Sequence, residues 1–312
     1  MKKSICILLM IVSSLFALAQ DTTFTETELS IDRFTDGTLT LPVAGDHKNL
    51  IIFIQGSGPT DRNGNQPMMQ NDGIKKIARE LAGNGIASFR YDKRVFKAQE
   101  LQLNEKDMIF EDFVSDATNV ATYFRSEENF SNIIIAGHSE GSLIGMLVAQ
   151  EHADAYISLA GAADPIDVIV TEQITNMAPT LGASARAAFD EIAENGKTSN
   201  YSPMLEAVFR PSVQPFIASW MKYKPSQEIK KLEIPVLIVN GTSDIQVNEE
   251  QAVKLAESNP NTELAILDHM NHIFRKIETK DRLVNSKSYN EPNLPLHPDL
   301  ISTLTEFVKE LD

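Results

Sequence analysis

Short apolar runs alternate with helix-like segments along most of the chain. Each run is hydrophobic throughout rather than at every second residue, which is typical of parallel strands that are covered on both faces. The segments between the runs repeat hydrophobic residues every three to four positions, as amphipathic helices do. The pattern therefore predicts an α/β fold with a doubly wound, mostly parallel sheet and right-handed helical crossovers. The predicted strands are 50–55, 86–91, 132–138, 155–160, 235–241 and 263–268, and the clearest predicted helices are 73–82, 108–124, 142–151 and 300–311.

Two parts of the chain depart from this alternation. Residues 25–34 and 38–43 have weaker strand patterns, and we expect them to form an antiparallel hairpin around Asp36-Gly37 at one edge of the sheet. Residues 162–227 contain helical patterns and several prolines but no convincing strand. We interpret them as an inserted helical cap over the carboxyl ends of the strands, where open α/β sheets bind ligands. Extra core helices are the alternative interpretation.

The N-terminus has the features of an export signal. Lys2 and Lys3 precede an almost unbroken apolar run from Ile5 to Leu18, which closes with Ala17-Leu18-Ala19. The run is short for a bilayer core of about 30 Å, and an Ala-x-Ala ending suits signal peptidase. We expect residues 1–19 to be a signal peptide and residues 20–312 to be one exported domain, periplasmic or extracellular, with no stable membrane anchor. An uncleaved anchor is the alternative.

Composition narrows the possible cofactors and partners. The only cysteine, Cys6, lies in the signal, so the mature chain has no thiol for a disulfide or a metal site. His269 and His272 are the only close pair of histidines, and we predict neither a metal nor a cofactor. The formal net charge of -15 disfavours nucleic acid as a partner, because phosphate binding depends on clustered Lys and Arg.

The strongest local signal is Gly137-His138-Ser139-Glu140-Gly141, which follows one predicted strand and opens a helix. Small residues flank such a serine because it sits on a sharp strand-to-helix turn that exposes its hydroxyl above the sheet. Ser139 is therefore the candidate nucleophile, and an ordinary tight turn is the alternative. A serine nucleophile needs a base to take its proton and an acid to orient that base.

Asp244 and His272 are the candidates for these two roles. Asp244 follows the predicted strand 235–241 through a short turn, and His272 follows the next strand, which gives the chain order serine, aspartate, histidine. We prefer His272 to His269, because His269 abuts the end of the strand whereas His272 lies further into a loop. The rivals of Asp244 are Asp268 and Asp281, neither of which follows a strand in this way.

The oxyanion formed during acyl transfer must be met by backbone N–H groups. Glu140, directly after the nucleophile, offers one of them. We expect the second from the glycine-containing loop 56–65, where Ser57 N–H is the first choice and Gly58 N–H the alternative. In the same loop, Asp61 and Arg62 either form a local ion pair or bind a substrate carboxylate.

With these residues assembled, the chain resembles bacterial serine esterases of the α/β-hydrolase superfamily, in particular the EstD-like group near the serine aminopeptidases. The stretches 55–65, 137–141 and 288–296 carry the resemblance, which spans nearly the whole mature chain. Gln55 departs from it, because many relatives have a histidine there, and 90–94 lacks the Gly-rich continuation often found at that place. The resemblance implies an α/β-hydrolase fold with a helical cap, hydrolysis of small-molecule carboxylic esters without a cofactor, and a Ser139, Asp244, His272 triad.

Two other functions stay open at this point. A serine aminopeptidase or amidase would use the same triad together with an acidic group, such as Glu140 or Glu172, that holds the amine of the substrate. A non-catalytic binding protein on a hydrolase scaffold is the other alternative, because a fold does not fix a function.

Overall fold

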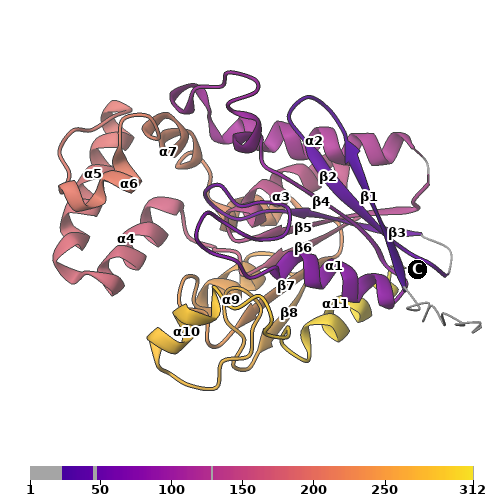
Figure 1. Cartoon of the computed structure of the whole chain (residues 1–312). Helices are drawn as coiled ribbons and strands as arrows, with labels where there is room; N and C mark the ends of the chain where they lie inside the picture. Colours follow the sequence, from indigo (N-terminus) through magenta and orange to yellow (C-terminus); the bar gives the residue numbers. More distant parts are fainter. Residues whose placement is uncertain (1–22, 45–47, 128, 312) are drawn as a thin grey trace, which may run out of the picture.

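The computed structural model describes residues 23–44, 48–127 and 129–311 (Figure 1). The signal peptide expected at residues 1–19, together with Cys6, lies outside the described residues. In the part of the chain that is described, no helix is both long and apolar enough to cross a membrane.

Within the described residues, eight strands form one sheet in the order β1-β2-β4-β3-β5-β6-β7-β8. Neighbouring strands from β4 to β8 are parallel, whereas β2 pairs antiparallel with both β1 and β4. The mostly parallel α/β sheet with an antiparallel edge, expected from the sequence, is confirmed. The strands are β1 (Phe24–Ser30), β2 (Asp36–Pro42), β3 (Asn49–Ile54), β4 (Ala87–Tyr91), β5 (Asn132–His138), β6 (Ala155–Leu159), β7 (Val236–Gly241) and β8 (Thr262–Leu267).

Helices cover both faces of this sheet, so side chains on both sides of the central strands are buried (Figure 1). In β3, for example, Ile51 and Phe53 pack toward α1 and α11, while Leu50 and Ile52 belong to the core formed with α2, α3 and α9. This two-sided burial explains why the strands are apolar throughout. The helices outside the insertion are α1 (Gly73–Gly83), α2 (Phe110–Ser126), α3 (Glu140–His152), α9 (Glu249–Ser258), α10 (Arg282–Ser288) and α11 (Leu300–Lys309).

The N-terminal hairpin forms, but its expected turn is wrong. Ser30 pairs with Asp36, so Asp36 and Gly37 lie inside β2 and the turn comprises residues 31–35. The Asp32 carboxylate closes this turn by accepting hydrogen bonds from the backbone N–H groups of Phe34 (2.8 Å) and Thr35 (3.0 Å). An Asp side chain that bonds to its own following backbone competes well with an Asp-Gly turn.

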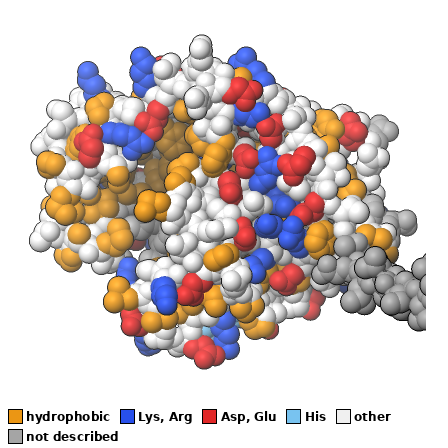
Figure 2. All heavy atoms as spheres, viewed as in Figure 1, with side chains coloured by type: hydrophobic (Ala, Val, Ile, Leu, Met, Phe, Trp, Pro, Cys, Tyr) orange, Lys and Arg blue, Asp and Glu red, His pale blue; other side chains and the backbone are white. Residues whose placement is uncertain are grey.

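The segment between β6 and β7 is helical and forms a lobe of its own, at the left of Figure 1. Phe189 and Phe209 stack edge to face at its centre, with ring centroids 4.8 Å apart. Figure 2 shows a hollow with hydrophobic walls between this lobe and the rest of the molecule, whereas acidic and basic side chains interleave on the right half of the same face. The helices of the lobe are α4 (Ile166–Met177), α5 (Gly182–Asn195), α6 (Glu206–Phe209), α7 (Gln214–Trp220) and α8 (Pro225–Glu228).

Candidate active site

Ser139 occupies a strained turn between β5 and α3. Its backbone has φ 55° and ψ −117°, a conformation that non-glycine residues rarely adopt. The two flanking glycines are required by close approach. A Cβ on Gly137 would lie 2.1 Å from the carbonyl oxygen of Gly141, and a Cβ on Gly141 would lie 2.3 Å from that of Ile54. The Gly-x-Ser-x-Gly pattern is therefore a packing requirement of this turn.

Asp244 and His272 meet at the carboxyl ends of β7 and β8. His272 Nδ1 donates to Asp244 Oδ2 over 2.7 Å, and the two side chains are 4% and 0% exposed. The other carboxylate oxygen of Asp244 accepts hydrogen bonds from the backbone N–H groups of Gln246 (2.8 Å) and Val247 (2.9 Å). A buried carboxylate with hydrogen bonds on both oxygens is fixed in place. It holds the imidazole through Nδ1, so Asp244 makes no contact with Nε2.

Ser139 and His272 line the same small pocket. Their strands lie in the order β5-β6-β7-β8, so the carboxyl ends of parallel strands bring together residues more than 130 positions apart in the sequence. Met69, Phe274 and Tyr289 supply apolar surface to this pocket. The chain thus has a serine, an imidazole and a carboxylate at one edge of the sheet.

The rival residues have other partners. His269 Nε2 lies 3.4 Å from the Asp268 carboxylate, and Asp268 is 78% exposed and also accepts from Thr242 Oγ1. Asp281 caps α10 by accepting a hydrogen bond from the Leu283 N–H group. None of the three lines the pocket that contains Ser139.

His138 supports the loop that carries His272, a role that the sequence did not suggest. Its Nε2 donates to the His272 carbonyl oxygen over 3.0 Å, and the two rings lie 4.7 Å apart. Burial, with the nearby His272 as a second cause, lowers the pKa of His138 to about 3. His138 is therefore neutral at physiological pH, with its proton on Nε2.

The loop that follows β3 lies against the turn that carries Ser139. A Cβ on Gly56 would be 3.3 Å from both Ser139 Cβ and His138 Nδ1, so the backbone of the loop touches the strained turn. Gly56 and Ser57 line the pocket, whereas the alternative donor residue, Gly58, is not among its lining residues. Glu140 is the first residue of α3, where backbone N–H groups have no partner within the helix.

A buried lysine next to these two backbone segments escaped the sequence reasoning. Lys93 follows β4, and its Nζ lies 2.7 Å from Glu140 Oε1 and 3.0 Å from the Gly56 carbonyl oxygen. In the sequence, a lysine that follows a strand cannot be told from a surface lysine. The only signal is that Lys93 follows an apolar strand next to the strands that lead into the candidate site.

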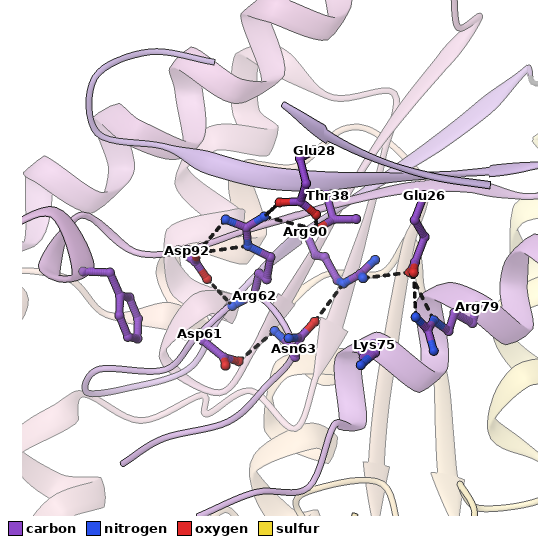
Figure 3. Close-up of a pocket in the computed structure, with 11 residues that line it drawn as sticks. Glu26, Glu28, Thr38, Asp61, Arg62, Asn63, Lys75, Arg79, Arg90 and Asp92 are labelled. Carbon is purple, nitrogen blue, oxygen red and sulfur yellow. Dashed lines mark hydrogen bonds and ion pairs between the residues drawn. The ribbon is translucent and has the colours of Figure 1, made fainter. Parts of the chain in front are cut away.

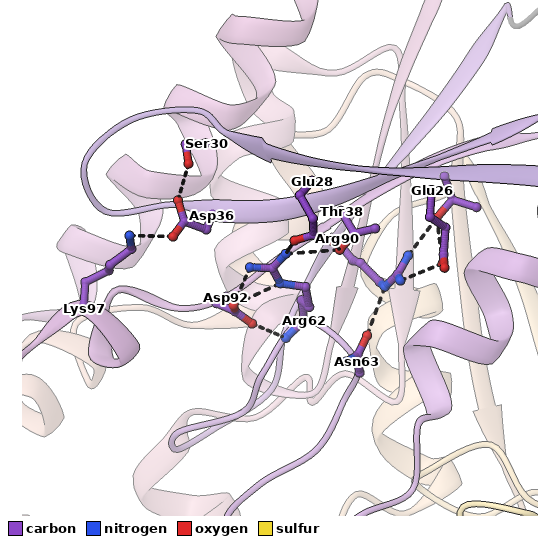
Figure 4. Close-up of polar contacts among 11 residues, drawn as sticks. Glu26, Glu28, Ser30, Asp36, Thr38, Arg62, Asn63, Arg90, Asp92 and Lys97 are labelled. Atoms are coloured by element: carbon purple, nitrogen blue, oxygen red, sulfur yellow. Dashed lines mark hydrogen bonds and ion pairs between the residues drawn. The ribbon is translucent and has the colours of Figure 1, made fainter.

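Arg62 pairs with acidic residues and does not line the pocket of Ser139. Figure 3 shows it between Asp92 and Glu28, in a charged pocket on the outer side of the loop. Its Nε and Nη2 donate to Asp92 Oδ2 over 2.9 and 2.7 Å, and it also pairs with Glu28. Figure 4 shows a separate cluster beside it, in which Arg90 donates to Asn63 and pairs with Glu26. Arg62 thus ties the loop to β1 and β4 and does not pair with Asp61.

Asp61 instead shapes its own turn. Its Oδ1 accepts hydrogen bonds from the backbone N–H groups of Asn63 (2.8 Å) and Asn65 (2.9 Å).

Among the described residues, no group of three or more His, Cys, Asp and Glu is arranged to hold a metal ion.

The sequence pattern of the family described as "Serine aminopeptidase, S33" matches residues 71–276, about two thirds of the chain, including Ser139, Asp244 and His272. The chain belongs to this family. Esterase EstD of Thermotoga maritima is 26% identical over 264 residues, which cover 82% of this chain and 62% of EstD. The chain therefore matches about three fifths of the length of that relative.

Solved structures show the same fold at low identity. Est1E from Butyrivibrio proteoclasticus with ferulic acid bound superposes with a TM-score of 0.56 at 19% identity, covering 91% of this chain and 96% of Est1E. Proline iminopeptidase of Mycobacterium smegmatis gives 0.53 at 14% identity, covering 92% and 98%. With the sheet order described above, these similarities show an α/β-hydrolase fold.

Proposed function

We propose that this family member is a serine hydrolase that cleaves carboxylic esters of small molecules through an acyl-enzyme. The observation that carries the proposal is the buried Asp244–His272 hydrogen bond beside Ser139 on its strained turn. These three residue types, in this chain order, are the parts of a serine triad.

The reaction would proceed in two steps. Ser139 Oγ attacks the ester carbonyl while His272 Nε2 takes its proton, and Asp244 stabilises the imidazolium that forms. The backbone N–H groups of Ser57 and Glu140 receive the oxyanion. His272 then protonates the leaving alcohol and activates a water molecule, which releases the acid from Ser139.

The state of Glu140 favours an ester over a peptide substrate. An aminopeptidase must hold the charged amine of its substrate, and Glu140 was the acidic residue closest in sequence to the nucleophile. Its carboxylate is 1% exposed and already paired with Lys93, so it is not available to a substrate. The other candidate, Glu172 of α4, is not among the residues that line the pocket of Ser139. The name of EstD supports the same choice, while the family description keeps peptide hydrolysis as the second candidate.

We further propose that residues 162–227 act as a cap and that the protein is exported after cleavage of residues 1–19. The residues that line the pocket around Ser139 come from the end of β5, from the loops after the strands, from the start of α1 and from the end of α10. Phe189 and Phe209 belong instead to the core of the lobe itself. The cap would therefore act by bounding the hydrophobic hollow of Figure 2 rather than by lining the pocket of Ser139 itself.

Turnover of p-nitrophenyl esters of graded chain length by residues 20–312 tests the function, with Ser139→Ala as the decisive variant. We expect ester turnover and one-to-one labelling by a fluorophosphonate, both lost in Ser139→Ala. Aminoacyl p-nitroanilides, assayed beside the esters, measure the amide-to-ester ratio, and a ratio above one would transfer the proposal to the peptidase. Full activity in Ser139→Ala would refute the nucleophile, and an inert, unlabelled wild type would favour a binding protein.

A further inference from the structure

Lys93 joins the two backbone segments that flank Ser139. Its ammonium group contacts the Gly56 carbonyl oxygen at 3.0 Å and the Glu140 carboxylate at 2.7 Å, and it lies 4.9 Å from the centre of the Phe113 ring. The Lys93 and Glu140 side chains are only 6% and 1% exposed. An ammonium group has three N–H donors, and the neighbours of this one are a carbonyl oxygen, a carboxylate and an aromatic ring.

The topology of the sheet explains why these residues meet. Strands β3, β4 and β5 are parallel neighbours in the order β4-β3-β5. Gly56 follows β3, Lys93 follows β4 and Glu140 follows β5 after one intervening residue, so all three emerge at the same edge. The lysine thus bridges from the outer strand across to the nucleophile turn.

The contact with Gly56 fixes a peptide plane. The Gly56 carbonyl and the Ser57 N–H belong to one peptide group, which is planar and trans, so the two bonds point in opposite directions. When Lys93 holds the carbonyl oxygen on one side, the Ser57 N–H is directed to the other side. Gly56 and Ser57 line the pocket of Ser139, and a hydrogen bond at the carbonyl also polarises the N–H of the same group.

The contact with Glu140 fixes the second segment. Glu140 is the first residue of α3, so a side chain held at Lys93 restrains the backbone N–H group at the start of the helix. The carboxylate is favoured there by the positive end of the helix dipole. Because the ammonium and the carboxylate neutralise each other, the pair orients both segments without placing a net charge beside the serine.

We propose that Lys93 is a positioning residue that holds the Ser57 and Glu140 N–H groups in place as a preformed oxyanion site. The proposal rests on the esterase function argued above. It assigns Lys93 an effect on the transition state and only a small one on ground-state binding, because the oxyanion exists only after Ser139 has attacked.

The size of the effect follows from what is lost. Removing one donor of an oxyanion site outright costs about 10²- to 10³-fold in kcat. Lys93→Met leaves both N–H groups in the chain but releases the peptide plane, and it leaves the Glu140 carboxylate unpaired near the developing oxyanion. We expect a fall in kcat of roughly tenfold to a hundredfold, with KM changed by less than about threefold.

The double variant Lys93→Met/Glu140→Gln protects the test against a failure to fold. It removes the unpaired buried charge, which is the main threat to stability in Lys93→Met. Arg94→Met is the matched control, because Arg94 is the adjacent residue and forms a similarly buried pair with Asp116, with side chains 9% and 2% exposed. It should lower the urea midpoint without lowering kcat.

The decisive measurement compares kcat and KM with the affinity of a trifluoromethyl ketone that carries the acyl group of the ester. Such a ketone adds Ser139 Oγ to its carbonyl carbon, and its oxygen then occupies the oxyanion site. In Lys93→Met and in the double variant, the inhibition constant should rise by the same factor by which kcat/KM falls.

Two outcomes would overturn the proposal. Wild-type kcat and inhibitor affinity in a folded Lys93→Met or double variant would show that the lysine is only structural, as would equal losses in Arg94→Met. Failure of the proposed function is separate from this, since it would appear as full activity in Ser139→Ala or as no ester turnover in the wild type.

Discussion

Replacing Asp244 by asparagine tests the buried acid with almost no change in volume. In the protein, the carboxylate accepts the Nδ1 proton of His272 at 2.7 Å and is shielded completely from solvent. An asparagine has one oxygen and one NH₂ group, and two of its backbone donors, Gln246 and Val247, still require the oxygen. The NH₂ group therefore faces His272 Nδ1, which must become an acceptor, so the imidazole proton moves to Nε2. A protonated Nε2 cannot accept the proton of the serine.

The magnitude of the loss can be worked from the same contact. With the charge centres about 4 Å apart and an effective dielectric constant of about 20, the carboxylate stabilises the imidazolium by about 4 kcal/mol. At about 1.4 kcal/mol per factor of ten, this corresponds to roughly a thousandfold in rate. The wrong tautomer adds to it, so kcat for a p-nitrophenyl ester should fall by about 10³- to 10⁴-fold.

Asp268→Asn is the matched control for this prediction. Asp268 follows the neighbouring strand but is 78% exposed and contacts His269 and Thr242 instead of His272. Its substitution should change kcat by less than about twofold, since exposed pairs contribute little. Steady-state kinetics at pH 7.5 on both folded variants decide the question. A nearly active Asp244→Asn protein, or an Asp268→Asn protein that loses its activity, would refute the assignment of the acid.

Two further predictions concern the turn and its support. Gly137→Ala should lower the free energy of unfolding by roughly 3 kcal/mol and abolish ester turnover, because its Cβ would lie 2.1 Å from the Gly141 carbonyl oxygen. Urea unfolding measures the loss of stability. The control is Gly83→Ala, whose Cβ has no neighbour closer than 3.9 Å. The pKa of His138 is about 3 in the folded protein, whereas an unfolded histidine has a pKa of about 6.5. Below pH 6.5 the unfolded chain therefore binds a proton that the folded protein does not bind, and stability falls as the pH drops toward 3. Urea midpoints at pH 7.5 and 4.5 should therefore differ more for the wild type than for His138→Gln, and an equal difference would contradict the assigned cause.

The central fold follows from sequence because burial on both faces leaves a plain signature. The interiors of runs such as 132–138 are apolar, and the predicted ends of the strands agree with the observed ends to within about one residue. The prediction of a hairpin turn at Asp36-Gly37 is wrong because of tertiary packing. Gly37 is a glycine because a Cβ there would lie 2.2 Å from the Phe89 ring of β4, and not because it turns the chain. A single sequence does not separate these two uses of glycine.

The site divides in the same way. Ser139, Asp244 and His272 could be proposed from sequence because each lies in a local context, a strand followed by a short turn, and because their order is informative. Lys93 and Arg62 could not be assigned. Their partners lie 47 and 30 residues away in the chain, and only the order of the strands brings them together.

These two basic residues fix the same loop from opposite ends. Arg62 ties the loop to Asp92, which directly follows β4. Lys93, the residue after Asp92, holds the Gly56 carbonyl oxygen. The loop is thereby anchored to one short segment, 92–93, which follows a strand buried along its whole length. In the proposed oxyanion site a donor must be held to within about half an ångström, and this double attachment to a rigid strand restrains a loop that its glycines alone would leave free to move.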